Sequence, residues 1–299
     1  DNTADRVAMI ESAIDQGYNV IVMPGYAFGA AIAETAPNFS DVKFIALDVS
    51  AGDLGEGFVV PANLYCAVYQ EELCGYMAGY AAVKLGYKHL GFLGGMAVPA
   101  VVRYGYGFVQ GADAAAKEIG ATDVKIEYGY GNQFYGDADI TAVMDTWYQT
   151  LGVQVVFACG GAIYTSAADA AVKVEGAKVI GVDVDQAGLI DSTYGEGLTL
   201  TSAMKGLAAT VNTLLTETTK GNFANYGGKV ETLGLVSGED ASLNYVGLPE
   251  STQWADAFTK DDYNKMVAAM FKGEITVSNA IDAEPAVTAV TVEYHGNVK

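Results

Sequence analysis

Carboxylates, aromatic rings and a lysine stand at the ends of short apolar segments in this sequence. Asp48, Asp183, Asp185 and Lys205 each end or follow such a segment, and Tyr26 follows another. Carboxylates accept hydrogen bonds from hydroxyl groups, and aromatic faces stack on flat rings. These residue types therefore suit a neutral ligand with a flat ring and hydroxyl groups. An alternative for the two acids near residue 183 is that they cap the following helix.

Catalytic and metal-binding arrangements find little support in the sequence. The chain has two histidines, His89 and His295, which leaves few bases near neutral pH and few nitrogen ligands for a metal. The stretch that starts at Asp183 begins like a calcium loop, but Ala187 and Tyr194 occupy positions five and twelve, where oxygen ligands are needed. We therefore expect no catalytic residue, no metal ion and no cofactor.

The composition describes a folded and strongly acidic protein. Its 299 residues include 36 acidic and 16 basic side chains, a formal charge of −20, and 51% are hydrophobic. Such a surface repels nucleic-acid phosphates, and no apolar run reaches the roughly 18–20 residues of a membrane span. The length suggests two domains. Cys66 and Cys74 lie in one expected helix, about 12 Å apart along its axis, too far for a disulfide.

Short β-branched or aromatic segments alternate with longer stretches rich in Ala and Gly. This spacing is typical of βαβ crossovers, and several segments are apolar throughout, as in parallel strands covered on both faces. The sequence therefore predicts an α/β protein with parallel sheets and two lobes that meet near residues 86–89. The expected strands are 19–25, 42–48, 89–95, 123–130, 153–160, 178–185 and 198–205, and the expected helices are 3–17, 27–36, 65–86, 99–119, 138–151, 164–175 and 205–220.

Two groups of aromatic residues predict different environments. Phe134 and Tyr135 lie in a loop that contains Gly and Asn, and loops expose rings for stacking. Tyr104, Tyr106 and Phe108 lie in a predicted helix, where core packing is favoured over a stacking surface. The glycines of that helix also fit packing, since they lack the GxGxxG spacing and do not follow a strand.

Six segments, taken in order, resemble a known family. They are residues 5–11 (DRVAMIE), 25–28 (GYAF), 76–82 (YMAGYAA), 91–96 (GFLGGM), 103–108 (RYGYGF) and 180–186 (IGVDVDQ). Together they resemble the basic membrane protein family, the solute-binding lipoproteins of bacterial ABC importers, which are related to purine-nucleoside receptors. The resemblance implies a type I periplasmic-binding-protein fold, with two Rossmann-like lobes, a hinge and a ligand cleft between the lobes.

The resemblance also implies lobe boundaries and site residues. Residues 1–87 and about 199–230 would form the N-terminal lobe, and 88–198 and about 231–299 the C-terminal lobe. Asp183 and Lys205 look like ribose contacts, Asp48 like a base or cleft contact, and Phe134 like one stacking ring.

The sequence departs from the family pattern at two places. The family usually begins with a further strand, helix and strand that supply a second stacking ring, and we expect the first lobe to lack them here. Gly161 matches a glycine that lines the pocket, but Tyr164 adds bulk where the family often has a glycine-rich loop. Tyr164 is therefore expected to replace a ring or alter which ligand fits.

These features predict an extracytoplasmic solute-binding protein of an ABC importer. It would bind a nucleoside, a purine nucleoside in particular, and deliver it to a permease as a monomer, with no nucleic-acid partner. The resemblance further implies a cell-surface lipoprotein anchored to the cytoplasmic membrane, its anchor outside this sequence. The alternatives are a ligand-sensing receptor for a nucleoside-like or flavin-like molecule, and a nucleoside hydrolase that uses Asp48 or Asp183.

Overall fold

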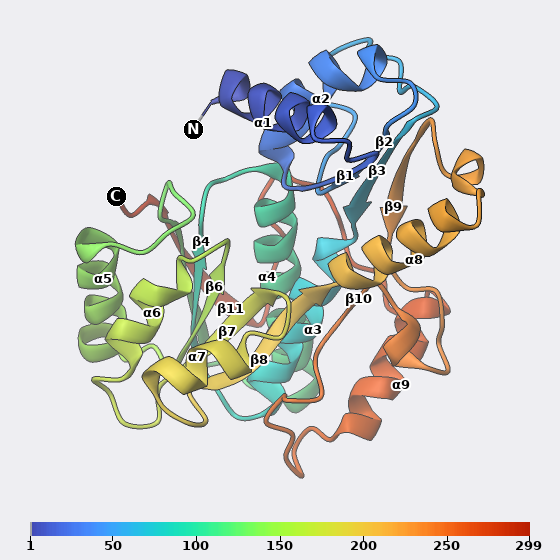
Figure 1. Ribbon diagram of the computed structural model, residues 1–299. Helices are drawn as coiled ribbons and strands as arrows, with labels where there is room; N and C mark the ends of the chain where they lie inside the picture. Colours follow the sequence, from blue (N-terminus) through green and yellow to red (C-terminus); the bar gives the residue numbers. More distant parts are fainter. Residues whose placement is uncertain (1) are drawn as a thin grey trace. The chain divides into compact units, whose positions relative to one another are not determined.

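A computed structural model describes residues 2–299. The chain forms two compact units, each assembled from two separate stretches of sequence (Figure 1). Unit 1 contains the chain up to Tyr69 together with Leu207–Leu233, and unit 2 contains Gln70–Gly206 and Gly234–Lys299. Both units contain a largely parallel sheet with helices, which confirms the predicted α/β class.

Unit 1 is built on a four-stranded parallel sheet with the strand order β1-β2-β3-β9. Its middle strands are buried along nearly their whole length, as expected for parallel strands in an α/β unit. Met23, Ile32 and Phe44 belong to its apolar core. The strands are β1 (Val20–Pro24), β2 (Lys43–Leu47), β3 (Leu64–Tyr69) and β9 (Lys229–Leu233), and the helices are α1 (Thr3–Asp15), η1 (Tyr26–Phe28), α2 (Gly29–Thr35), η2 (Ala36–Asn38), α8 (Leu207–Thr219) and η4 (Phe223–Asn225).

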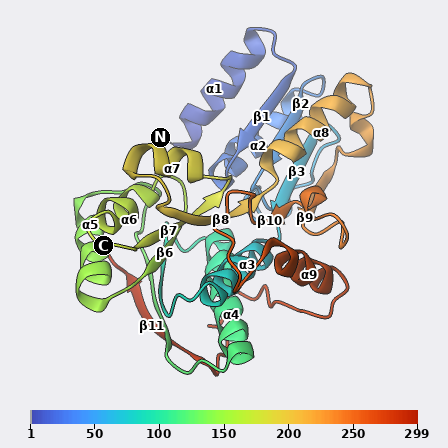
Figure 2. The same cartoon turned by 90° about the horizontal axis from the view of Figure 1, so that it is seen from below.

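Unit 2 is built on a seven-stranded sheet with the order β10-β8-β7-β6-β4-β5-β11, in which β10 alone among the described strands is antiparallel to its neighbour. Helices α5, α6 and α7 lie on one side of this sheet, and α3 and α4 lie on the other (Figure 2). The strands are β4 (His89–Gly94), β5 (Val124–Tyr130), β6 (Val155–Cys159), β7 (Lys178–Asp183), β8 (Thr199–Lys205), β10 (Val246–Gly247) and β11 (Val290–Asn297), and the helices are α3 (Glu71–Lys84), α4 (Pro99–Ile119), α5 (Ala138–Asp145), η3 (Thr146–Leu151, a π-helical turn), α6 (Tyr164–Ala171), α7 (Ala187–Tyr194), η5 (Ala241–Leu243) and α9 (Lys260–Phe271).

Helices α3 and α4 pack with their backbones in close contact. A Cβ atom on Gly107 would lie 2.2 Å from the carbonyl oxygen of Glu72, and one on Gly111 would lie 2.0 Å from that of Tyr76. Any side chain at these positions would force the helices apart. The glycines of α4 therefore serve helix packing, as the sequence predicted, and the close packing brings the first turn of α3 against Arg103.

Aromatic side chains fill the layer between the sheet and α4. The ring of Phe92 lies 4.5 Å from that of Tyr128 and 5.4 Å from that of Phe157, measured between centroids. Tyr104 and Phe108 on α4 contact Phe157 at 5.8 Å and 5.5 Å. Tyr104 and Phe108 are thus core residues, which confirms the packing interpretation for these two rings.

Both histidines of the chain meet at one buried carboxylate. Nε2 of His89 on β4 lies 2.9 Å from Oε1 of Glu127 on β5, and Nε2 of His295 on β11 lies 2.6 Å from Oε2. Since β4, β5 and β11 are neighbours, the three side chains form a row across three strands. Burial alone would raise the pKa of Glu127, but the hydrogen bonds from His295 and His89 outweigh burial and lower its pKa.

Part of the predicted helix 65–86 is wrong. Residues Leu64–Tyr69 form the buried strand β3, and helix α3 begins only at Glu71. A short apolar run fits a buried strand and a buried helix equally well, so hydrophobicity alone did not separate them. Cys66 therefore lies in a strand, and the helical spacing to Cys74 does not apply, although both thiols are free and buried.

The boundaries of the compact units differ from the expected lobe boundaries. Residues 70–87 and 199–206, expected in the first lobe, lie in unit 2. Helix α3 packs on α4, and β8 extends the seven-stranded sheet by pairing with β7. Because of these contacts, the first compact unit ends at Tyr69 and not near residue 87.

Candidate functional site

Asp183 and Lys205 lie side by side at the carboxyl ends of two neighbouring strands. Strands β7 and β8 are parallel, with Asp183 opposite Met204, and Nζ of Lys205 lies 3.2 Å from Oδ1 of Asp183. The Lys205 side chain is 5% exposed and the Asp183 side chain 33% exposed, so solvent reaches the carboxylate while the ammonium group is nearly buried. Such a pair can accept a hydrogen bond from one hydroxyl of a diol and donate one to the other.

Asp183 and Asp48 share an uncommon backbone conformation. Their φ angles are +67° and +58°, in the left-handed region, which is costly for residues with a Cβ atom and is tolerated best by Asn and Asp. Asp183 is the last residue of β7, and Asp48 directly follows β2. Residues held in this region often belong to functional sites, so the backbone supports a ligand-binding role for both aspartates.

Phe134 lies against glycines that follow two other strands of the same sheet. A Cβ atom on Gly95 would lie 2.5 Å from Cδ1 of the Phe134 ring, and one on Gly160 would lie 2.8 Å from the same atom. A Cβ on Gly161 would lie 2.6 Å from the carbonyl oxygen of Phe134. The ring is half-buried, so the three glycines make room for it and fix its position at the sheet edge.

The other predicted ligand contacts have different surroundings. Tyr164 opens α6 and packs, partly buried, against the apolar cluster beneath α5 and α6. Tyr26 opens η1 in unit 1 and is exposed. Asp185 accepts hydrogen bonds from the backbone N–H of Ala187 at the start of α7 and from the hydroxyl of Ser251, as the capping interpretation predicts for this acid.

The predicted residues therefore fall into two sets. Asp183, Lys205, Phe134 and Gly161 lie along the carboxyl edge of the sheet in unit 2. Asp48 and Tyr26 belong to unit 1, where each follows the carboxyl end of a strand. Ligands of open α/β sheets bind outside this edge, so each set occupies the side of its sheet where binding is expected.

Glu71 is a charged residue of the site that the sequence analysis did not identify. Nε of Arg103 donates a hydrogen bond to Oε2 of Glu71 over 2.7 Å, and Oε1 of Glu71 lies 3.9 Å from Nζ of Lys205. The Glu71 side chain is only 1% exposed. The signal that could have revealed it is the pair of consecutive glutamates at positions 71 and 72 in an otherwise apolar segment.

Tyr104 completes the surroundings of the Asp183–Lys205 pair. Its hydroxyl donates toward Oδ1 of Asp183 at 3.4 Å and the carbonyl oxygen of Ala203 at 3.3 Å. Nζ of Lys205 lies 5.5 Å from the centre of the Tyr104 ring, within the range of a cation–π contact. Burial raises the pKa of Tyr104 far above its usual value, so the hydroxyl stays protonated and available as a donor.

Glu72 shows how strongly this region penalises an unpaired charge. It is 4% exposed, and burial raises its pKa to about 7, although a backbone hydrogen bond and the charge of Arg103 oppose the increase. The network thus contains two carboxylates, Asp183 and Glu71, and two cations, Lys205 and Arg103. The paired charges balance, which favours a neutral polar ligand over a phosphate.

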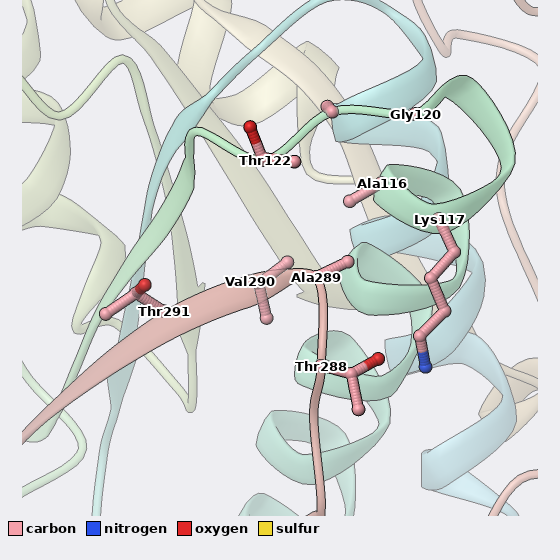
Figure 3. Close-up of a pocket in the computed structure, with 9 residues that line it drawn as sticks. Ala116, Lys117, Gly120, Thr122, Thr288, Ala289, Val290 and Thr291 are labelled. Atoms are coloured by element: carbon pink, nitrogen blue, oxygen red, sulfur yellow. The ribbon is translucent and has the colours of Figure 1, made fainter.

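A separate pocket of about 310 Å³ lies between the end of α4 and the start of β11 (Figure 3). Its lining includes Lys117, Thr122, Thr288 and Thr291, and Lys117 is already paired with Asp113 at 2.5 Å. None of the predicted ligand contacts lines this pocket.

Across residues 2–299, no group of three or more His, Cys, Asp or Glu side chains is arranged to hold a metal ion. No described helix is both long and apolar enough to cross a membrane.

Comparison with solved structures identifies the fold as that of type I periplasmic solute-binding proteins. A solute-binding protein of an ABC transporter system from Conexibacter woesei DSM 14684 superposes with a TM-score of 0.67 at 21% sequence identity, covering 93% of this chain and 85% of that one. At this level of identity the likeness concerns the fold alone. It agrees with the two α/β units and their parallel sheets.

The chain belongs to the basic membrane protein family, described as ABC transporter substrate-binding protein PnrA-like, whose sequence profile matches residues 1–278. Basic membrane protein B from Borreliella burgdorferi is 27% identical over 250 residues, which cover 83% of this chain and 67% of that protein. The ABC transporter nucleoside-binding protein BmpA from Lactococcus lactis subsp. cremoris is 26% identical over 288 residues, covering 92% of this chain and 76% of that protein. The family membership confirms the resemblance found in the sequence.

Proposed function

We propose that this substrate-binding protein binds a nucleoside, a purine nucleoside in particular, and delivers it to the permease of an ABC importer. The observation that carries the proposal is the Asp183–Lys205 pair. Asp183 ends β7, and the neighbouring strand β6 is followed by Gly160, which lies against the Phe134 ring. Adjacent strands are about 4.8 Å apart, so a ring on Phe134 and a sugar at Asp183 are separated on the scale of a single nucleoside.

Each part of the site has a partner in such a ligand. Asp183 and Lys205 would bind the two ribose hydroxyls, and Phe134 would stack on the base. Asp48 of unit 1 would bind the base or another polar edge of the ligand. Two observations support this assignment: the charge-balanced network favours a neutral ligand, and the relative from Lactococcus lactis is a nucleoside-binding protein.

The transport role adds further proposals. The ligand is held in a cleft between the two lobes, and its contacts with both lobes shift the population toward a closed state that the permease recognises. The protein works outside the cytoplasm as a lipoprotein on the membrane surface. It acts as a monomer and leaves the nucleoside chemically unchanged.

Calorimetric titration of the full-length mature protein tests the function directly. We expect a purine nucleoside to bind more tightly than its free base, because only the nucleoside offers a sugar to Asp183 and Lys205. The nucleoside 5′-monophosphate should also bind more weakly than the nucleoside. A free base that binds as tightly as its nucleoside would contradict the ribose assignment, and release of base during a long incubation would favour a hydrolase.

A further inference from the structure

Lys205 carries a nearly buried positive charge that has two carboxylates nearby. Its ammonium group is 3.2 Å from Asp183 and 3.9 Å from Glu71. Asp183 is partly open to solvent, and in the proposed function it also binds ligand hydroxyls. A buried cation is energetically costly unless a carboxylate lies beside it. Glu71 is therefore the carboxylate that stays beside Lys205 when Asp183 binds a ligand.

The Glu71 carboxylate is fixed from two directions. Arg103 on α4 donates to Oε2 over 2.7 Å, and the close helix contact at Gly107 holds α3 against α4. Glu71 is also the first residue of α3, where the partial positive charge of a helix N-terminus stabilises a carboxylate. Its charged group therefore has a defined position before any ligand arrives.

The other oxygen of this carboxylate faces Lys205 without a hydrogen bond. Oε1 of Glu71 is buried and has no hydrogen-bond partner among the described residues, while Nζ of Lys205 lies just beyond hydrogen-bond distance from it. A buried carboxylate oxygen is seldom left in this state. The ammonium group thus lies between two carboxylates, closer to the exposed Asp183 and farther from the buried Glu71.

We propose that Glu71 is a positioning residue for ligand binding, an inference that rests on the proposed function. It acts through Lys205: its buried carboxylate holds the ammonium group at the sheet edge beside Asp183, ready to donate to a ligand hydroxyl. Arg103 supports it by neutralising and orienting the same carboxylate. Glu71 does not touch the ligand.

The adjacent glutamate offers a matched control. Glu72 has the same side chain, lies in the same helical turn and is also buried. Its pKa of about 7 leaves it partly protonated at neutral pH, so Glu72→Gln resembles a form that the protein already populates. Glu71→Gln therefore removes the carboxylate that faces Lys205, whereas Glu72→Gln changes the adjacent carboxyl group of the same helix.

Nucleoside affinity is measured first, in the wild type and both variants. We expect Glu71→Gln to weaken binding about tenfold or more, in line with the removal of one partner from a buried charge pair, and Glu72→Gln to change it by less than about threefold. Glu71→Asp keeps the charge but withdraws it by one methylene, so its affinity should fall between wild type and Glu71→Gln. Equal effects of Glu71→Gln and Glu72→Gln would overturn the proposal.

A double-mutant cycle separates positioning from a purely structural role. In a Lys205→Met background, Glu71→Gln should cost less than about twofold in affinity, because the group through which Glu71 acts is already absent. If the two substitutions weaken binding additively, Glu71 does not act through Lys205 and the proposal fails.

An NMR measurement on the ligand-free protein distinguishes failure of this proposal from failure of the proposed function. In protein labelled with ¹⁵N-lysine, the Nζ signal of Lys205, identified by its loss in Lys205→Met, should shift in Glu71→Gln and stay in place in Glu72→Gln. If Glu71→Gln does not fold, Glu71→Asp must shift the signal. A wild type that binds no nucleoside refutes the function alone, whereas an unchanged Lys205 signal refutes the role of Glu71.

Discussion

Two buried glutamates of unit 2 lie in different parts of the same fold and differ in how completely they are paired. Both oxygens of Glu127, between β4 and β11, accept a hydrogen bond from an imidazole. Glu71, at the carboxyl-end site, has one oxygen bonded to Arg103 and the other facing Lys205 at 3.9 Å. We infer from this difference that the fully paired Glu127 holds strands together, whereas the proposed role of the partly paired Glu71 is to keep Lys205 available for a ligand.

The largest effect on stability is expected at Glu127, because both of its carboxylate oxygens are hydrogen-bonded. Glu127→Gln should lower the free energy of unfolding by about 3–4 kcal/mol, because two charge-assisted hydrogen bonds are lost in a buried place. Nucleoside affinity should stay the same. Urea denaturation measures the loss, with Glu293→Gln as the control, since Glu293 is an exposed glutamate that pairs in register with Glu127. Equal stabilities of the two variants would break the comparison.

The loss of stability in Glu127→Gln depends on pH. Because the folded pKa of Glu127 is lowered, its stabilisation is complete above the unfolded pKa of about 4.3. It is lost as the pH falls through the folded pKa. The stability difference between wild type and Glu127→Gln should therefore be constant near neutral pH and shrink under acid conditions.

Glu72 extends the comparison to a third buried glutamate, in which a backbone hydrogen bond and the charge of Arg103 do not offset the effect of burial on the pKa. Its pKa is raised from 4.5 to about 7, so the folded state favours the protonated form. Stability from this group is complete below pH 4.5 and is lost as the pH rises through about 7. Relative to Glu72→Gln, the wild type should lose roughly 3 kcal/mol over this range. A pH-independent difference between the two proteins in urea denaturation would refute the assignment.

Asp183 tests the ligand side of the partly paired site. Asp183→Ala should weaken nucleoside binding by about 2–3 kcal/mol through lost charge-assisted hydrogen bonds and leave the fold intact. Calorimetry with a ribonucleoside and its 2′,3′-dideoxy analogue sharpens the result, because the variant keeps only Lys205 for the ribose hydroxyls and should distinguish the two ligands less than the wild type does. Asp185→Ala, which removes the helix-capping acid two residues away, serves as the control and should retain that distinction.

The smallest effect is expected at the stacking ring. Phe134→Ala should weaken binding by about 1–2 kcal/mol through the lost base–aromatic contact, and Phe134→Tyr should restore most of it. Tyr135→Ala provides a neighbouring exposed ring as control. If Tyr135→Ala weakens binding more than Phe134→Ala, the stacking ring has been assigned to the wrong residue.

Much of the fold followed from local sequence patterns. Seven predicted strands correspond to β1, β2 and β4 to β8, because their apolar runs are bounded by clear turns. Strand β3 was missed because its six residues are apolar on both faces, and hydrophobicity does not distinguish such a strand from a helix. Strand β11 was missed for the opposite reason: it lies at a sheet edge, and its side chains alternate toward solvent.

The site was harder to predict because its contacts join distant parts of the chain. Asp183 and Lys205 could be named, since both stand at strand ends where ligands bind. Glu71 and Arg103 could not, because their contact depends on glycine-mediated packing of two helices. The row of His89, Glu127 and His295 similarly requires the order of three strands, which no local pattern contains.

The divided sequence of each unit has a consequence for how the protein folds. In unit 1, β3 pairs with β9, and in unit 2, β5 pairs with β11; about 160 residues separate the two strands of each pair. Pairings between such distant segments slow folding, because loop-closure entropy is lost before the contacts form. Each sheet can be completed only after its late strand has been synthesised, so unit 1 stays incomplete until β9 has left the ribosome and unit 2 until β11 has done so.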